Sequence, residues 1–136
     1  MAAVEALCAD IARRHGIVAH RVLAHSDVAP RRKIDPGEKF DWKRLAKAGI
    51  GHWAEPASLS AGEILSRDAS GDAVSHLQEN LRAYGYGLDP TGEYSGETEF
   101  VVAAFQRHFR PALVDGQADR STRETLDALL AALPAA

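Results

Sequence analysis

Two turns in the C-terminal half of the chain share one sequence pattern, and this repeat restricts the fold more than any other feature. Each turn has a glycine, five further residues and a threonine: Gly92 to Thr98 and Gly116 to Thr122. Glycine permits a tight turn, and polar residues ahead of a helix can satisfy its free backbone N–H groups. The repeat therefore predicts two similar turns that each lead into a helix.

Apolar residues at helical spacing occur in three segments around these turns. They are Val74, Leu77 and Leu81 in the first segment, Phe100, Val101, Ala104 and Phe105 in the second, and Leu126, Leu129 and Leu130 in the third. We therefore expect an all-α module of three helices over residues 71–134.

The N-terminal fifty residues have a different pattern. Apolar residues at helical spacing predict a helix over residues 3–15, and the β-branched segment Ile17–Leu23 predicts a short strand. A loop that contains two prolines follows, after which Asp41 is placed to cap a short helix that ends at Gly49. Helix, strand, loop and helix over residues 1–50 indicate a fragment of an α/β domain.

Residues 51–70 lose this periodicity and are rich in alanine, serine and glycine, which is typical of a connector. The expected organisation is thus an α/β fragment over residues 1–50, a linker over residues 51–70 and the three-helix module over residues 71–134.

Composition excludes several classes of function. The net charge of -3 argues against non-specific electrostatic binding to nucleic acid. The basic run Arg31–Lys33 is typical of a solvated turn. Cys8 is the single cysteine, so neither an intrachain disulfide nor a multi-cysteine metal site can form. No segment approaches the roughly 18 apolar residues of a membrane span.

The loop before Trp42 is dense in side chains that bind metals. His25 and Asp35 lie ten residues apart on a proline-stiffened loop, and zinc accepts imidazole nitrogen and carboxylate oxygen. Spacing alone also allows a hydrogen-bonded pair or two solvated side chains. Asp27 lies between them and is expected to brace either the loop or one of the ligands.

The segment HSDVAPRRKIDPG (residues 25–37), followed by FDW (residues 40–42), closely resembles the metal-binding loop in the C-terminal part of type 2 (amidase_2) N-acetylmuramoyl-L-alanine amidases. The resemblance implies that His25 and Asp35 are two of three zinc ligands and that Lys33 lies near the scissile amide. It also implies hydrolysis of the bond between the lactyl group of N-acetylmuramic acid and L-alanine, with zinc activating the water. An ammonium group such as that of Lys33 would stabilise the developing oxyanion.

The C-terminal seventy residues resemble the three-helix peptidoglycan-binding domain PG_binding_1. The resemblance rests on short motifs, among them YGYG (residues 84–87), TGEY (residues 91–94) and AFQR (residues 104–107). It implies that peptidoglycan or muropeptides are the partners. Tyr84, Tyr86 and Tyr94 lie near turns and are candidates for contact with glycan or stem peptide, with core packing as the alternative.

The family's first zinc histidine and its catalytic glutamate have no counterpart before His25. Two ligands hold zinc less firmly than three, so this chain alone is expected to be a poor or inactive amidase, truncated relative to the family. The alternative is a non-catalytic peptidoglycan-binding protein that carries a relic amidase loop. Family resemblance places such a protein in the periplasm or cell envelope; the cytoplasm is the alternative, because the sequence contains no export signal.

Overall fold

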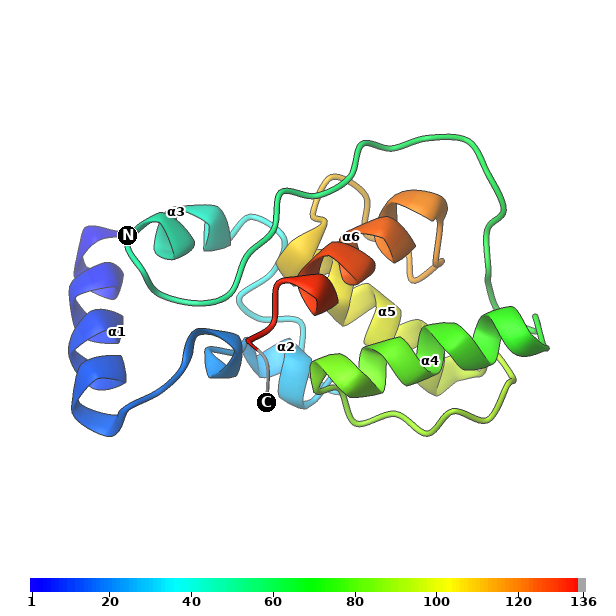
Figure 1. The fold of residues 1–136 in the computed structure, drawn as a ribbon, viewed down its shortest axis with the longest axis horizontal. Helices are drawn as coiled ribbons and strands as arrows, with labels where there is room; N and C mark the ends of the chain where they lie inside the picture. Colours follow the sequence, from blue (N-terminus) through cyan, green and yellow to red (C-terminus); the bar gives the residue numbers. More distant parts are fainter. Residues whose placement is uncertain (135–136) are drawn as a thin grey trace.

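The computed structural model describes residues 1–134, which form helices joined by turns and long loops (Figure 1). The elements are α1 (Ala2–His15), the 3₁₀ turn η1 (Ala19–Arg21), α2 (His25–Val28), α3 (Trp42–Lys47), α4 (Asp72–Tyr84), α5 (Gly96–Phe109) and α6 (Arg120–Ala131). β-structure in the described residues is limited to two single bridges, Leu65 with Ala118 and Ser70 with Glu93. None of the helices described is long and apolar enough to cross a membrane.

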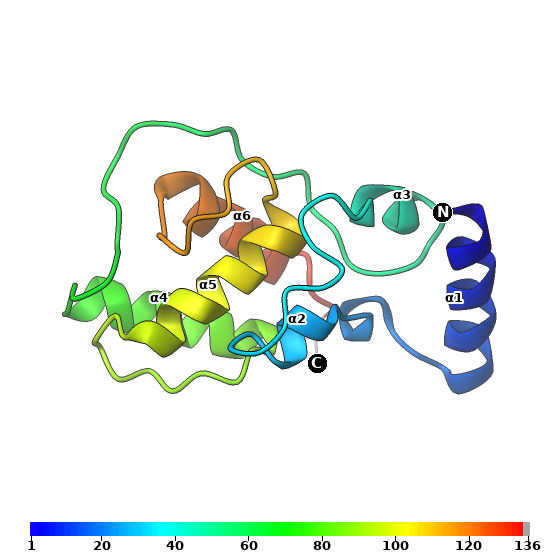
Figure 2. The ribbon, with the colours of Figure 1, turned by 180° about the vertical axis from the view of Figure 1, so that it is seen from behind.

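The helices α4, α5 and α6 pack against one another, as the apolar spacing predicts (Figures 1 and 2). Their core includes Val74, Leu77, Leu81, Val101, Ala104, Phe105, Leu126 and Leu129. Phe100 departs from the prediction, since 43% of its surface is exposed. Its neighbours Val101 and Val102 occupy the inward face of α5, which leaves Phe100 on the outer side.

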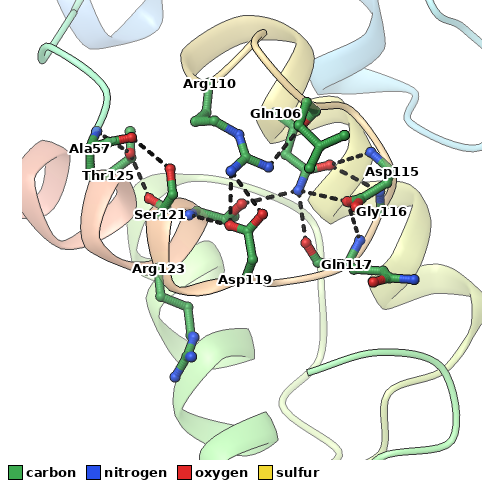
Figure 3. A network of polar contacts seen from close by, with 12 residues as sticks. Ala57, Gln106, Arg110, Asp115, Gly116, Gln117, Asp119, Ser121, Arg123 and Thr125 are labelled. Carbon is green, nitrogen blue, oxygen red and sulfur yellow. Dashed lines mark hydrogen bonds and ion pairs between the residues drawn. The ribbon is translucent and has the colours of Figure 1, made fainter. Parts of the chain in front are cut away.

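Each turn of the repeat is closed by a buried glutamine of the preceding helix. In the second turn, Gln106 of α5 accepts hydrogen bonds from the backbone N–H groups of Asp115 and Gly116, at 3.0 and 2.9 Å (Figure 3). Its amide group donates to the carbonyl oxygen of Gln117 at 2.8 Å and to Thr122 Oγ1 at 3.0 Å. The repeated threonine is therefore the partner of a buried amide.

The first turn has the same arrangement. Gln78 of α4 accepts from the backbone N–H of Gly92 at 2.9 Å and donates to the carbonyl of Glu93 at 2.9 Å and to Thr98 Oγ1 at 3.0 Å. Gly92 and Gly116 have φ values of 80° and 73°, which L side chains rarely adopt. The predicted repeat is thus confirmed as a structural repeat.

The segment predicted as a linker packs along α6. Ser121 Oγ donates to the carbonyl of Ala57 at 2.6 Å, and the Ala57 N–H donates to Thr125 Oγ1 at 3.0 Å (Figure 3). Leu65 is buried and forms a backbone bridge with Ala118. Residues 51–70 are therefore attached to the helical module at several points.

The N-terminal region has a small core of its own, formed by Ala24, Trp42, Leu45 and Ile50. The Asp41 side chain caps α3 by accepting from the N–H of Arg44 at 3.0 Å, as predicted. Helix α1 lies at the far end of the molecule from α4 and α6, contains no fully buried residue, and is joined to α3 by an ion pair between Glu5 and Arg44 (Figures 1 and 2).

The strand predicted over Ile17–Leu23 is not formed. The segment instead contains the 3₁₀ turn η1, flanked by extended residues such as Val18 and Val22. A β-strand is stabilised by hydrogen bonds to a neighbouring strand, and the described residues contain no such strand beside this segment. The α/β character expected for residues 1–50 is therefore absent from this structure.

Candidate functional site

The structure brings His25 and Asp35 together. His25 Nδ1 and Asp35 Oδ2 are 3.2 Å apart, and the two side chains are 50% and 63% exposed. Two donors at about 2.0–2.1 Å from a tetrahedral zinc ion lie roughly 3.3 Å apart. The spacing, the donor types and the exposure of this pair therefore fit two of the ligands of a zinc site.

The backbone of the loop holds these two residues side by side. The N–H of Ser26 donates to the carbonyl of Asp35 at 3.1 Å, which closes the loop beside the donor pair. The carbonyl of Ala29 accepts from the N–H groups of Arg32 and Lys33, both at 3.0 Å, which folds the intervening chain into a turn. Residues ten positions apart are thus joined by local hydrogen bonds.

Lys33 has a partly exposed side chain that forms no hydrogen bond or ion pair with the described residues. Its neighbour Arg31 points instead to α5, where its guanidinium pairs with Glu97 at 2.6 Å. Lys33 therefore differs from Arg31, which makes an exposed surface contact with the helical module.

A third metal donor is absent from the part of the chain that the structure describes. No group of three or more His, Cys, Asp or Glu side chains is placed to hold a metal ion among residues 1–134. Within these residues, His25 and Asp35 are the two candidate donors that lie together.

Asp27 braces the loop, as predicted, and does so by joining it to the helical module. Its carboxylate is buried and accepts hydrogen bonds from the N–H of Ala24 at 2.8 Å, the hydroxyl of Tyr86 at 2.6 Å and Nδ1 of His108 at 2.6 Å. No motif or spacing in the sequence marked His108 as a partner of the loop. Its place on the same face of α5 as Ala104, four residues earlier, indicated burial, but nothing local indicated a partner 81 positions away.

The three candidate tyrosines are buried. Tyr84, Tyr86 and Tyr94 are 8%, 6% and 2% exposed, which corresponds to the core-packing alternative. Burial, and to a smaller extent the Asp27 charge, raises the pKa of Tyr86 well above its usual value of 10, so its hydroxyl is a donor. All three hydroxyls are bonded internally: Tyr84 to His52 Nδ1, Tyr86 to Asp27 Oδ1 and Tyr94 to the carbonyl of Gly116.

A pocket of about 310 Å³ lies where the loop meets the module. Its lining includes His20, Arg21 and Val28 from the N-terminal region and Tyr84 and Gly87 from the module. Of the three candidate tyrosines, Tyr84 and Tyr86 line this pocket and Tyr94 does not.

Comparison with known proteins identifies relatives of the C-terminal module and of most of the chain. Residues 70–126 match the family model described as "Putative peptidoglycan binding domain". The chain is 41% identical over 126 residues to N-acetylmuramoyl-L-alanine amidase AmiD of Escherichia coli (strain K12), a match that covers 91% of this chain and 45% of the relative.

Two solved structures are similar in fold. One is the complex of Escherichia coli AmiD with the substrate anhydro-N-acetylmuramic acid-L-Ala-D-gamma-Glu-L-Lys (38% identity, TM-score 0.76, covering 95% of this chain and 50% of that one). The other is AmpDh3 from Pseudomonas aeruginosa (32% identity, TM-score 0.72, covering 98% and 52%). The chain spans about half the length of the relatives it matches. Residues 70–126 thus match the peptidoglycan-binding family model, and nine-tenths of the chain is homologous to about half of an N-acetylmuramoyl-L-alanine amidase.

Proposed function

We propose that this chain functions in peptidoglycan hydrolysis of the N-acetylmuramoyl-L-alanine amidase type, with His25 and Asp35 as two zinc ligands. The observation that carries the proposal is the 3.2 Å approach of an imidazole nitrogen and a carboxylate oxygen at an exposed position. Similarity to amidases over nine-tenths of the chain supports the same assignment.

In this proposal zinc, when bound, polarises the lactyl-L-alanine carbonyl and activates the attacking water. His25 and Asp35 would hold the metal through Nδ1 and Oδ2. Lys33 places a positive charge beside the oxygen that becomes negative in the transition state, a contribution of roughly 3 kcal/mol for one such electrostatic group. Residues 70–126 bind peptidoglycan, which raises the local concentration of the amide bond at the loop. Action on peptidoglycan places the chain in the periplasm or cell envelope.

A second candidate is a non-catalytic peptidoglycan-binding protein with an amidase-like loop. One observation favours it: residues 1–134 offer no third donor beside His25 and Asp35. The Asp27 carboxylate, which lies two residues after His25, is already bonded to His108 and Tyr86 and is therefore not free to act as a general base.

One experiment separates these functions. The purified chain is mixed with insoluble peptidoglycan in the presence of zinc, and both the bound protein and the released stem peptides are measured. Sedimentation with peptidoglycan, together with peptide release that His25→Ala abolishes, supports the amidase. Sedimentation without release supports the non-catalytic binder, and failure to sediment contradicts both.

A further inference from the structure

A single side chain of the helical module contacts both ends of the metal loop. His108 of α5 is 2% exposed, and its Nδ1 donates to Oδ2 of Asp27, two residues after His25. Its ring also stacks on Trp42, just beyond the end of the loop, with ring centroids 3.8 Å apart and an angle of 23° between the planes. His108 therefore contacts one residue near the start of the loop and one residue just after its end.

Tyr86 supplies a second bond from the module to the same carboxylate. Its hydroxyl donates to Asp27 Oδ1 at 2.6 Å, while His108 and the N–H of Ala24 donate to Oδ2. A buried carboxylate is costly unless hydrogen bonds compensate for its lost hydration. With only 4% of its side chain exposed, Asp27 obtains two of its three donors from the helical module.

Local hydrogen bonds connect Asp27 to the His25–Asp35 pair. The bond from the Ala24 N–H to Asp27 fixes the single turn of α2, and this turn sets the direction of His25. The next residue, Ser26, closes the loop by donating to the carbonyl of Asp35. A displacement of Asp27 therefore changes the positions of both His25 and Asp35.

We propose that His108 and Tyr86 act, through Asp27, as positioning residues for the His25–Asp35 pair, so that the peptidoglycan-binding module is part of the metal site's support. The identity of the metal rests on the proposed function; the positioning of the loop does not. The module is accordingly a structural partner of the site as well as a means of attachment to peptidoglycan.

The chain offers a matched control for this proposal. Tyr86→Phe and Tyr94→Phe each remove a buried hydroxyl from the same module, but Tyr94 donates to the carbonyl of Gly116, away from the loop. A general loss of stability affects both variants. A loss of loop closure affects only Tyr86→Phe.

His108 allows its two contacts to be separated. In His108→Asn the side-chain amide nitrogen takes the place of Nδ1 and keeps the donor for Asp27, whereas His108→Phe keeps the stacking on Trp42 but removes the donor. Rescue by asparagine and not by phenylalanine would identify the hydrogen bond as the positioning contact.

The experiment follows the full chain by two readouts. The first is the hydrogen-exchange rate of the Ser26 amide, measured by NMR relative to a core amide of α5. The second is the dissociation constant for zinc, measured by competition with a chromogenic chelator. In Tyr86→Phe and His108→Phe we expect Ser26 exchange about tenfold faster and zinc binding about tenfold weaker, as expected for one lost hydrogen bond. Tyr94→Phe and His108→Asn should stay within about twofold of wild type.

The proposal is overturned if Tyr86→Phe and His108→Phe leave Ser26 exchange unchanged, or if Tyr94→Phe accelerates it equally. It is also overturned if exchange accelerates while a measurable zinc affinity stays the same. If the wild-type chain binds no zinc but Ser26 exchange responds as expected, the proposed metal function fails and the positioning of the loop by the module stands.

Discussion

The helical module and the N-terminal region are built in opposite ways. The module buries its apolar residues in one continuous core and closes each repeated turn with a buried glutamine. The N-terminal region buries only Ala24, Trp42, Leu45 and Ile50 in its own core. It also exposes large apolar residues along its length, namely Leu7, Ile11, Ile17, Val18, Leu23, Val28 and Ile34.

The helical module therefore supplies most of the stability, whereas the candidate metal donors lie in the N-terminal region. The candidate metal donors lie in the weakly packed region, yet their loop is fixed by α5 of the strongly packed module. Functional loops are commonly positioned by a rigid scaffold in this way.

The largest expected loss of stability comes from creating a cavity in the core of the helical module. Phe105 is completely buried, so Phe105→Ala should lower the free energy of unfolding by about 4 kcal/mol. Leu45→Ala, in the small core, should loosen the N-terminal region while the module remains folded. Urea denaturation followed by circular dichroism, with amide exchange to locate the change, tests this contrast. An equal loss of protection in α4 to α6 for Leu45→Ala would remove the distinction between the regions.

The repeat predicts two nearly equal effects within the module. Gln78→Leu and Gln106→Leu each leave backbone N–H and C=O groups of a partly buried turn without their side-chain partner, so each should cost about 2 kcal/mol in unfolding free energy. Thermal and urea denaturation of both variants provide the comparison. If only one substitution is destabilising, the two glutamines are not equivalent.

The turn before α6 contains an ion pair that should make the module sensitive to acid. Arg110 holds Asp119 at 2.8 and 2.9 Å (Figure 3). Burial alone would raise the pKa of Asp119, but the Thr122 N–H and the Arg110 guanidinium outweigh it and lower the pKa below 3.8.

A lowered pKa in the folded state means that Asp119 stabilises the protein above the pKa of 3.8 that it has when unfolded. This contribution is lost as the pH falls through the lower, folded value. Asp119→Asn should cost about 2 kcal/mol at pH 7 and less near pH 2. Urea midpoints of both proteins between pH 2 and 7 measure this; a difference independent of pH would contradict the assignment.

The smallest change in unfolding free energy is expected for the surface ion pair between the N-terminal region and the helical module. Arg31 and Glu97 are both well exposed, so Arg31→Ala should change the unfolding free energy by less than about 1 kcal/mol. It should also leave Ser26 exchange unchanged. A larger effect would mean that the loop depends on this surface pair and not on the buried Asp27.

The sequence predicted the local features of both regions. The repeat and the apolar spacing placed α4, α5 and α6, and Asp41 and Gly49 placed the ends of α3. Two kinds of feature were missed. A strand over Ile17–Leu23 needs a neighbouring strand, which local β-propensity does not supply. The bond between Asp27 and His108 joins residues 81 positions apart, so no spacing rule reveals it.

The central claim is that His25 and Asp35 form a zinc-binding pair, and a zinc titration of the purified chain tests it most directly. His25→Ala and Asp35→Ala are compared with wild type and with His20→Ala, a neighbouring histidine that does not belong to the pair. We expect the wild-type chain to bind one zinc ion. Its zinc affinity should be at least about tenfold weaker in His25→Ala and in Asp35→Ala, and unchanged in His20→Ala. Zinc binding that survives both substitutions, or no binding by the wild-type chain, would contradict it.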